Sequence, residues 1–210
     1  MIVKAMENLR KNNMEVYFAA TKADVVPLVK QLVPEGATVS AGGSVSLQES
    51  GVMELLRSGR YNFLDRAREG ITPAEIEQVY RDTFSADCFF CSANAITTRG
   101  ELVNVDGNSN RIAALLFGPK NVIVVAGINK LVKDVPEGFA RIKKVAAPKN
   151  TRRLGCNTYC NKTGECVAVY GDATMGCAGD ARICRNYLVC GPQRIPGRIK
   201  VILVNEELGY

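Results

Sequence analysis

Six cysteines lie within 35 residues near the C-terminal end of the chain, a density that suggests metal or redox chemistry. They are separated by three, five, ten, six and five residues, and they are Cys156, Cys160, Cys166, Cys177, Cys184 and Cys190. Glycines are interleaved among them, and a glycine-rich segment without apolar periodicity has little core of its own. We therefore expect a metal or an iron–sulfur cluster to hold it, because four thiolates suit either group. The alternative is a set of free or disulfide-paired thiols in a mobile tail.

The chain contains no histidine, which narrows the chemistry that it can perform. A histidine general base, a histidine-based catalytic triad and a histidine metal ligand are all excluded. Any metal site must therefore be built mainly from cysteine thiolates and carboxylates.

The net charge of +6 is spread unevenly along the sequence. Residues 141–200 hold twelve Lys and Arg against three Asp and Glu. Such a basic segment suits nucleic acid, an anionic cofactor, an acidic partner or a set of thiolates that needs compensating charge. The chain has no tryptophan and no aromatic residues interleaved with the basic ones, so the pattern does not favour nucleic acid. A solvated face is the simpler alternative.

No stretch approaches the roughly 20 apolar residues that a membrane span needs. Residues 1–13 have the pattern of an amphipathic helix rather than a signal peptide. We therefore expect a cytoplasmic protein, in which thiols stay reduced and a structural set of disulfides is not favoured. A homo-oligomer is compatible with this composition.

The rest of the sequence alternates strand-like and helix-like segments. Strands are predicted at 15–19, 37–41, 61–64, 87–96, 102–105, 121–126 and 198–205. Helices are predicted at 1–13, 21–33, 46–57, 72–84 and 111–117, and over 129–153 with an interruption at 135–138. This alternation predicts one α/β domain over residues 1–210, with an open, mostly parallel sheet and helices on both faces. The cysteine-rich segment, 154–197, is then an insertion before the last strand.

Three loops follow predicted strands and could hold a ligand at the carboxyl edge of the sheet. Residues 41–46 join a buried strand to a helix start, 106–111 are dense in polar groups, and 129–130 follow the strand at 121–126. Together they predict a pocket for a small anionic ligand. The alternative is that they are ordinary glycine-rich or polar turns that only connect a strand to a helix. The candidate ligand-binding residues in these loops are Gly42, Gly43, Ser44, Ser46, Gly107, Asn110, Arg111, Asn129 and Lys130.

Two carboxylates near these loops are candidate catalytic groups. Glu49 lies three residues after Ser46 and could be a general base or a nucleophile, or it could simply complete a capping box. Asp106 begins the second polar loop and could be a base or a helix cap.

Cys88 and Cys91 are three apart in a predicted strand, so their side chains should point to opposite faces as core thiols.

Several stretches together resemble the LUD-domain family of lactate utilisation proteins (the LutC and YkgG type), in its short cysteine-bearing branch. These stretches are residues 92–97 (SANAIT), 100–107 (GELVNVDG), 110–114 (NRIAA), 117–130 (FGPKNVIVVAGINK) and 201–209 (VILVNEELG). Asn94, in the first of them, joins the candidate ligand-binding residues.

The resemblance implies the NagB/RpiA/CoA transferase-like fold, which ribose-5-phosphate isomerase, glucosamine-phosphate deaminase and CoA transferases share. It also implies a role in lactate oxidation beside iron–sulfur or redox partner subunits, and so favours a 4Fe-4S cluster over zinc. The cysteine pattern of the short branch implies four ligands and leaves Cys156 and Cys190 as alternates: Cys160, Cys166, Cys177 and Cys184. The gap between the second and third of these is ten residues, where that pattern has two.

Three hypotheses follow. The first is a cluster- or zinc-bearing protein of lactate utilisation that acts with redox partners. The second is an isomerase- or CoA-transferase-like enzyme that binds an anionic substrate at residues 42–44. The third is a metal-stabilised binding module whose basic segment docks an acidic partner.

Overall fold

The structure, a computed structural model, describes residues 1–210 and is built around a sheet of six parallel strands. In spatial order the strands are β1 (Glu15–Ala19), β10 (Ile199–Val204), β7 (Asn121–Gly127), β4 (Cys88–Cys91), β2 (Thr38–Ala41) and β3 (Asn62–Leu64). The central strand β7 pairs with β10 on one side and with β4 on the other. Its uninterrupted β-branched sequence is buried on both faces, as a central parallel strand requires. The predicted open parallel α/β sheet is confirmed.

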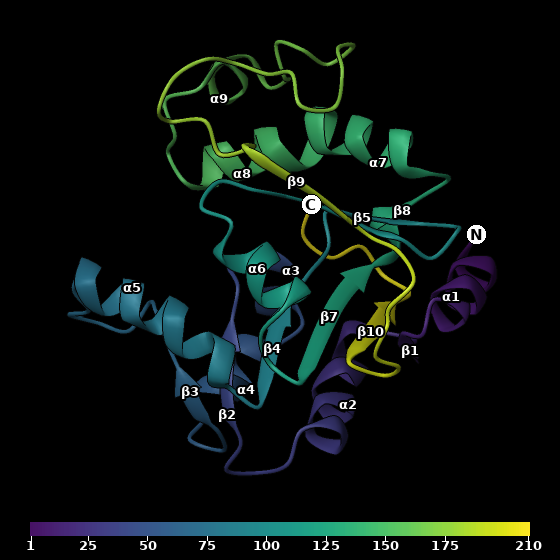
Figure 1. Ribbon diagram of the computed structural model, residues 1–210, viewed down its shortest axis with the longest axis vertical. Coiled ribbons are helices and arrows are strands. Elements are labelled where there is room, and N and C mark those ends of the chain that lie inside the picture. Colours follow the sequence, from purple (N-terminus) through teal and green to yellow (C-terminus); the bar gives the residue numbers. More distant parts are fainter.

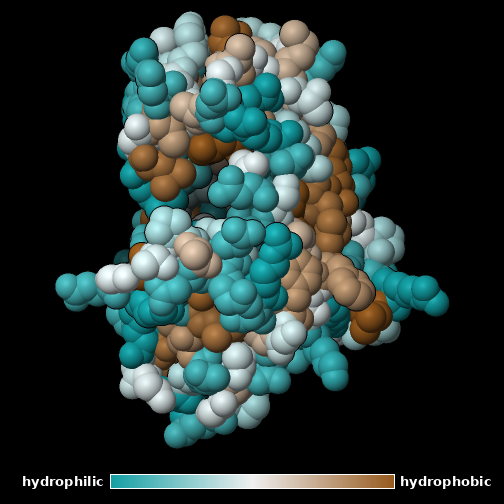
Figure 2. All heavy atoms as spheres, turned by 60° about the vertical axis from the view of Figure 1, so that its left-hand side comes forward, coloured by the Kyte–Doolittle hydropathy of each residue, from teal (hydrophilic) through white to brown (hydrophobic).

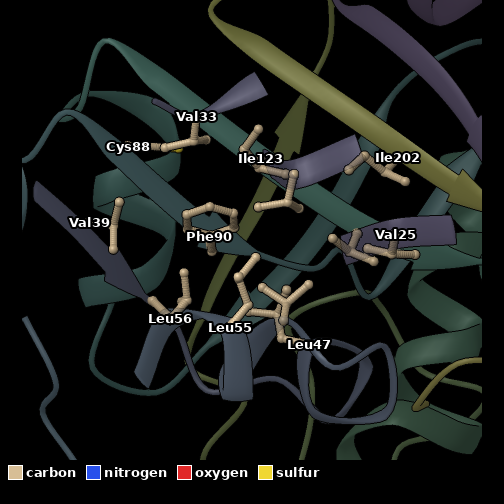
Figure 3. Packing of buried hydrophobic residues seen from close by; sticks show 14 of the residues in the cluster. Val25, Val33, Val39, Leu47, Leu55, Leu56, Cys88, Phe90, Ile123 and Ile202 are labelled. Carbon is tan, nitrogen blue, oxygen red and sulfur yellow. The ribbon is translucent and has the colours of Figure 1, made fainter. Parts of the chain in front are cut away.

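One face of this sheet is covered by α2 (Val25–Leu32), α3 (Val45–Glu49) and α4 (Val52–Arg57). Figure 3 shows the packing on this side, where Leu47, Leu55 and Leu56 approach Phe90 of β4. Phe90 is fully buried, and Ile123 of β7 lies in the same cluster. The neighbouring residue Phe89 points the other way, into a second core.

The second core is covered by α1 (Ile2–Lys11), by α6 (Asn110–Leu116) and by a smaller sheet. The smaller sheet contains four strands in the order β8 (Leu131–Val132), β5 (Ala95–Thr97), β6 (Leu102–Asp106) and β9 (Asn186–Cys190). Helices therefore lie on both faces of the large sheet, as predicted. Cys88 lies in the first core and Cys91 in the second, so the prediction of two core thiols on opposite faces is also confirmed. Burial raises the pKa of each of these thiols to about 12.

The small sheet is covered by a helical layer made of α7 (Val135–Arg141), a π-helical turn (Ile142–Ala146) and α8 (Ala147–Arg153). A short helix, α9 (Tyr159–Thr163), follows within the cysteine-rich segment. Figure 1 shows this segment and α9 at the top of the molecule, above α7 and α8 and far from β2 and β3. The remaining helix, α5 (Pro73–Asp82), has Pro73 in its first turn and begins with a capping box formed by Thr72 and Glu75.

Three predicted elements were wrong in their extent. The strand expected over 87–96 is two strands in different sheets, because the chain leaves the large sheet after Cys91. The helix expected over 46–57 is broken at Gly51, whose φ of 74° is left-handed. Residues 135–138 were expected to interrupt the helix over 129–153, but they form the first turn of α7. The reason is that Asp134 caps this helix and Pro136 suits its first turn.

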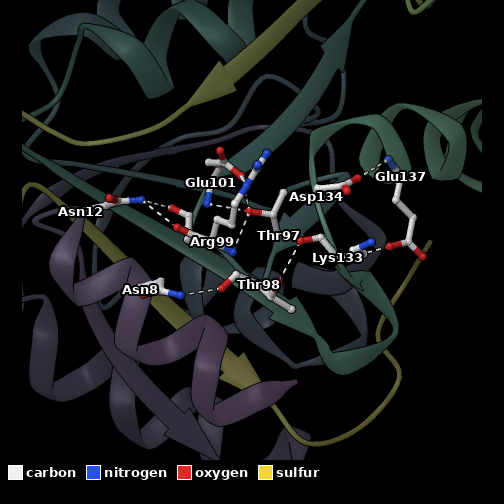
Figure 4. A network of polar contacts seen from close by, with 10 residues as sticks. Asn8, Asn12, Thr97, Thr98, Arg99, Glu101, Lys133, Asp134 and Glu137 are labelled. Atoms are coloured by element: carbon white, nitrogen blue, oxygen red, sulfur yellow. Dashed lines mark hydrogen bonds and ion pairs between the residues drawn. The ribbon is translucent and has the colours of Figure 1, made fainter.

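The turn between β5 and β6 is attached to α1 by amide side chains (Figure 4). Asn8 donates to the carbonyl of Thr98 at 2.8 Å, and Asn12 donates to the carbonyl of Gly100 at 2.8 Å. Gly100 has a φ of 82°, and a Cβ at this position would collide with the backbone of Asn8 and Leu9. This contact fixes the small sheet relative to the first helix.

No helix of the structure has both the length and the apolar character that a membrane crossing requires.

Candidate functional site

The three predicted ligand loops meet at one cavity of about 310 Å³ between the large sheet and the helical layer above it. Figure 2 shows the surface hollowed between the upper and lower parts of the molecule. Nine of the predicted ligand-binding and catalytic residues line the cavity, and they are Gly43, Ser44, Ser46, Asn94, Asp106, Gly107, Asn110, Arg111 and Lys130. The carboxyl ends of β2, β4 and β7 in the large sheet supply part of this lining, as expected for an open α/β sheet, and the segment that follows β6 of the small sheet supplies the rest.

Lys130 is the most deeply buried charged group in this cavity. Its residue is 3% exposed, and its Nζ donates to Ser46 Oγ at 2.8 Å and to Ser92 Oγ at 2.9 Å. Burial, reinforced by the nearby cations Arg141 and Arg111, lowers the pKa of Lys130 to about 7. The amine is therefore able to change its protonation state near neutral pH.

Two guanidinium groups join the large sheet to the small one beside Lys130. Arg111, from α6, donates to the carbonyl of Val105 at 2.6 Å and to Asn104 Oδ1 at 2.7 Å. Arg141, from α7, donates to the carbonyl of Asn94 at 2.6 Å, and burial lowers its pKa. Both cations are satisfied mainly by neutral oxygens, so much of their charge is left to act on the cavity.

Asp106 is the acidic side chain of the cavity lining. Its Oδ2 is buried and accepts no hydrogen bond, although Arg111 Nε lies 3.6 Å away. A buried carboxylate oxygen without a donor can accept one from a ligand. The predicted role of Asp106 in the site is thus compatible with its position, and it remains a prediction.

Two cations at the cavity, Arg66 and Arg153, were missed by the sequence analysis. A Cβ placed on Gly43 would lie 2.7 Å from Arg66 Nη2 and 4.0 Å from Arg153 Nη2. Arg66 donates to the hydroxyl of Tyr80 at 2.9 Å, and Arg153 donates to the hydroxyl of Tyr210 at 2.8 Å. The excess of basic residues in 141–200 was a signal for Arg153, whereas nothing in the local sequence marks Arg66.

Three predicted site residues do not line the cavity. Glu49 is the last residue of α3, and its carboxylate accepts a hydrogen bond from the backbone N–H of Gly209 at 2.6 Å. Asn129 binds the same segment, because it accepts from Leu208 N at 3.2 Å and donates to the carbonyl of Gly209 at 3.1 Å. Gly42 leaves room for the aliphatic part of Arg111, since a Cβ there would lie 3.0 Å from it. These three residues do not face the cavity themselves. They hold in place the segments that surround it.

The helix start that was expected to attract an anion is weaker than predicted. Ser44, rather than Ser46, caps α3 by accepting from Leu47 N at 3.3 Å. The helix has only five residues, so its dipole is small, and the positive charge of the site comes from side chains instead.

The cysteine-rich segment is held by two cations rather than being a plain loop. Lys143 is 3% exposed, and it donates to the backbone carbonyls of Ala168 and Gly171 at 2.9 Å each and to that of Asp172. Arg182 donates to the carbonyls of Cys184 at 2.9 Å and Thr174 at 2.6 Å. These two basic residues therefore stabilise the segment through its backbone carbonyls.

The six cysteines of this segment do not share one environment. Cys160 and Cys166 are buried within the segment, and Cys184 also lines the cavity. Burial raises the pKa of Cys166, and the thiols of Cys184 and Cys160 contribute in the same direction. Cys190 is instead the last residue of β9 and packs in the second core, where burial raises its pKa to about 11. It is thus poorly placed as an alternate ligand, while Cys156 and Cys177 are half-buried.

Comparison with known proteins identifies the family. A family model described as the LUD domain matches residues 2–204. The chain belongs to the LUD domain family. This family is linked to lactate utilisation. The crystal structure of a DUF162 family protein from Deinococcus radiodurans is similar at 13% identity and a TM-score of 0.47, over 97% of this chain and 95% of that one. No curated protein sequence matches.

In this LUD domain protein, the cysteines fit a thiolate-bound group in their chemistry. Cys160, Cys166 and Cys184 are buried thiols, and the buried ammonium of Lys143 favours the ionised form of Cys166. No three Cys, Asp or Glu side chains of the chain are arranged as ligands of one ion. The donor atoms are therefore suitable, and a ligand set of four would need the segment to close further.

The cavity of this LUD domain protein has the chemistry of an anion site with an acid–base group. Four basic side chains line it against one carboxylate, and Lys130 can exchange a proton near neutral pH. Neutral donors and acceptors surround them, and these are Ser44, Ser46, Ser92, Asn94, Asn108, Asn110 and Asn150.

Proposed function

We propose that this LUD domain protein binds a small organic acid of the lactate type in the cavity and acts on it in lactate utilisation. The observation that supports this is the charge of the lining. Arg66, Lys130 and Arg153 form no ion pair with any carboxylate of the chain, and Arg111 has only Asp106 as a partner, at 3.6 Å.

The size and polarity of the cavity agree with a small hydroxy acid. A volume of about 310 Å³ is at the small end of the range for ligand sites, roughly 300 to 1,000 Å³. A guanidinium such as that of Arg153 binds a carboxylate through two parallel hydrogen bonds. The amides and hydroxyls of the lining would bind the remaining hydroxyl or carbonyl oxygen.

Isothermal titration calorimetry with lactate and pyruvate tests this proposal. We expect binding by the unaltered protein and a loss of about tenfold or more in affinity for Arg153→Gln, because one charge-assisted pair contributes about 1.5–3 kcal/mol. Arg81→Gln is the matched control, since Arg81 is exposed on α5 and away from the cavity. Absence of binding by both acids, or equal affinity in the two variants, would refute the proposal.

We also propose a cluster-bearing role for the cysteine-rich segment, with Cys160, Cys166, Cys177 and Cys184 as the ligands of an iron–sulfur cluster. It is supported by the burial of Cys160, Cys166 and Cys184 and by the ammonium of Lys143, which favours the ionised form of Cys166. Such a cluster would supply one-electron chemistry to redox partner subunits. Since Cys184 also lines the cavity, the two proposed sites would adjoin.

Anaerobic purification followed by metal analysis and an absorbance spectrum tests the cluster. Stoichiometric iron and sulfide are expected, with loss of both in Cys166→Ser and retention in the core variant Cys190→Ser. Stoichiometric zinc without iron would favour the zinc alternative and the binding-module hypothesis, and a metal-free protein would refute both.

A further inference from the structure

The cavity contains a buried lysine between two serine hydroxyls, an arrangement that binding of an anion does not require. Lys130 follows β7, Ser92 follows β4 and Ser46 lies in α3, so three different elements bring these groups together. Lys130 Nζ is 2.8 Å from Ser46 Oγ and 2.9 Å from Ser92 Oγ. All three residues line the cavity, and Ser92 is the most exposed of them at 7%.

The two serines differ in what their own protons do. Ser46 Oγ donates to the backbone carbonyl of Leu208 at 3.1 Å, so its proton is already used. Ser92 Oγ has only distant acceptors, Ser46 Oγ and the carbonyl of Ala93, each at 3.4 Å. When Lys130 is neutral, its lone pair needs a donor, and Ser92 is the hydroxyl that is free to provide one.

The surroundings of Lys130 allow the neutral amine to exist. The groups that face it are Arg141 from α7, Arg111 from α6, Glu49 from α3 and Cys91 from β4. Burial and the two arginines favour the neutral form and outweigh the carboxylate of Glu49, so the pKa of Lys130 falls to about 7. An amine with this property next to a hydroxyl is a general base for a serine nucleophile.

We propose that Ser92 is the nucleophile of an acyl-transfer reaction in which Lys130 is the general base and Ser46 positions Lys130. The substrate class is an ester or thioester whose acyl part has a carboxylate. The inference rests on the proposed anion site, because the cations of the cavity would orient that carboxylate.

The reaction balances with water as the second substrate. Ser92 passes its proton to neutral Lys130 while Oγ forms a bond to the acyl carbon. The bond from that carbon to the leaving oxygen or sulfur breaks, and the leaving group takes the proton from Lys130. Water then attacks the acyl carbon, again losing a proton to Lys130, and Ser92 regains its hydrogen as the free acid leaves.

Reaction with 4-nitrophenyl hemisuccinate, an activated ester with one free carboxylate, tests this inference. We expect rapid release of 4-nitrophenolate and a succinyl group on the peptide that contains Ser92, identified by mass spectrometry. Ser92→Ala and Lys130→Met should each slow the release by about 100-fold or more, the usual contribution of a general base. The rate for the unaltered protein should rise as the pH increases through about 7.

Two control variants separate chemistry from folding. Ser40→Ala alters a buried serine in β2 that binds Thr83 outside the cavity, and Lys120→Met alters an exposed lysine, so both should react like the unaltered protein. If Lys130→Met fails to fold, the pH profile and the site of the succinyl group still decide. Release that persists in Ser92→Ala, or a succinyl group elsewhere, would overturn the inference. Lactate binding in calorimetry without labelling of Ser92 would refute this inference while leaving the proposed anion site standing.

Discussion

The buried ammonium of Lys143 should control how often the cysteine-rich segment opens. In Lys143→Met the side chain keeps its length but loses its hydrogen bonds to the carbonyls of Ala168, Gly171 and Asp172. A hydrogen bond to a charged group contributes about 1.5–3 kcal/mol, and such contributions do not add fully. Removing the cost of burying a charge offsets part of the loss. We therefore expect the free energy of local opening to fall by about 2–4 kcal/mol.

This change corresponds to roughly a 30- to 1,000-fold larger open population. The assay is alkylation of the reduced, chelator-treated protein by iodoacetamide, with mass spectrometry following each cysteine separately. Cys160 and Cys166 are buried, so they react only from the open state, whereas half-buried Cys156 is an internal reference. Both buried thiols should react faster in Lys143→Met by about the factor given above.

Lys149→Met is the matched control, because Lys149 is an exposed lysine of the neighbouring helix α8. It should leave the alkylation rates of Cys160 and Cys166 unchanged. Unchanged rates in Lys143→Met would refute the argument that this ammonium holds the segment together.

Three further predictions concern the frame of the site. In urea unfolding, Gly100→Ala should destabilise the protein by at least about 2 kcal/mol more than Gly36→Ala. Both glycines have a positive φ, but only Gly100 faces the backbone of α1. Similar losses for the two variants would contradict this prediction. Phe90→Ala should lower the free energy of unfolding by about 3–5 kcal/mol, because it leaves a cavity against β7. Phe84→Ala should lower it far less, because Phe84 is 40% exposed. Equal losses of stability in thermal unfolding would argue against this core. Because the pKa of Lys130 falls from 10.5 to about 7 on folding, the unfolded chain binds the extra proton between these values. The unaltered protein should therefore gain stability relative to Lys130→Met as the pH rises from about 7 to about 10, and parallel pH curves would show that the lysine stays charged.

Local sequence patterns were sufficient to predict those helices and strands whose signals lie within a few neighbouring residues. The apolar run of β7 predicts a central parallel strand because only burial on both faces suits it. The capping box at Thr72 and Glu75 predicts the start of α5 because its hydrogen bonds lie within one turn. In contrast, the separation of β4 from β5 depends on which sheet each strand joins, and no local pattern records that choice.

The candidate site divides in the same way. The sequence placed Ser46, Asp106, Arg111 and Lys130 in loops at strand ends. Parallel topology brings the loops of Ser46 and Lys130 to one edge of the large sheet, whereas Asp106 and Arg111 arrive from β6 of the small sheet and the segment that follows it. The sequence could not assign the roles of these residues. The hydrogen-bond partners of Lys130, for example, are serines that lie 38 and 84 residues away in the chain.

The sequence by itself determined the parallel α/β fold, the exclusion of histidine chemistry, the three ligand loops at strand ends and the dense cysteine segment. Only the tertiary structure decided that Glu49 and Asn129 hold the segment at Leu208 and Gly209, and that Cys190 is a core residue. It also decided that Lys130 lies between two serines and that Lys143 holds the cysteine-rich segment. The physical reason is that burial and charge compensation depend on groups from distant parts of the chain, whereas strand and helix signals depend on neighbours.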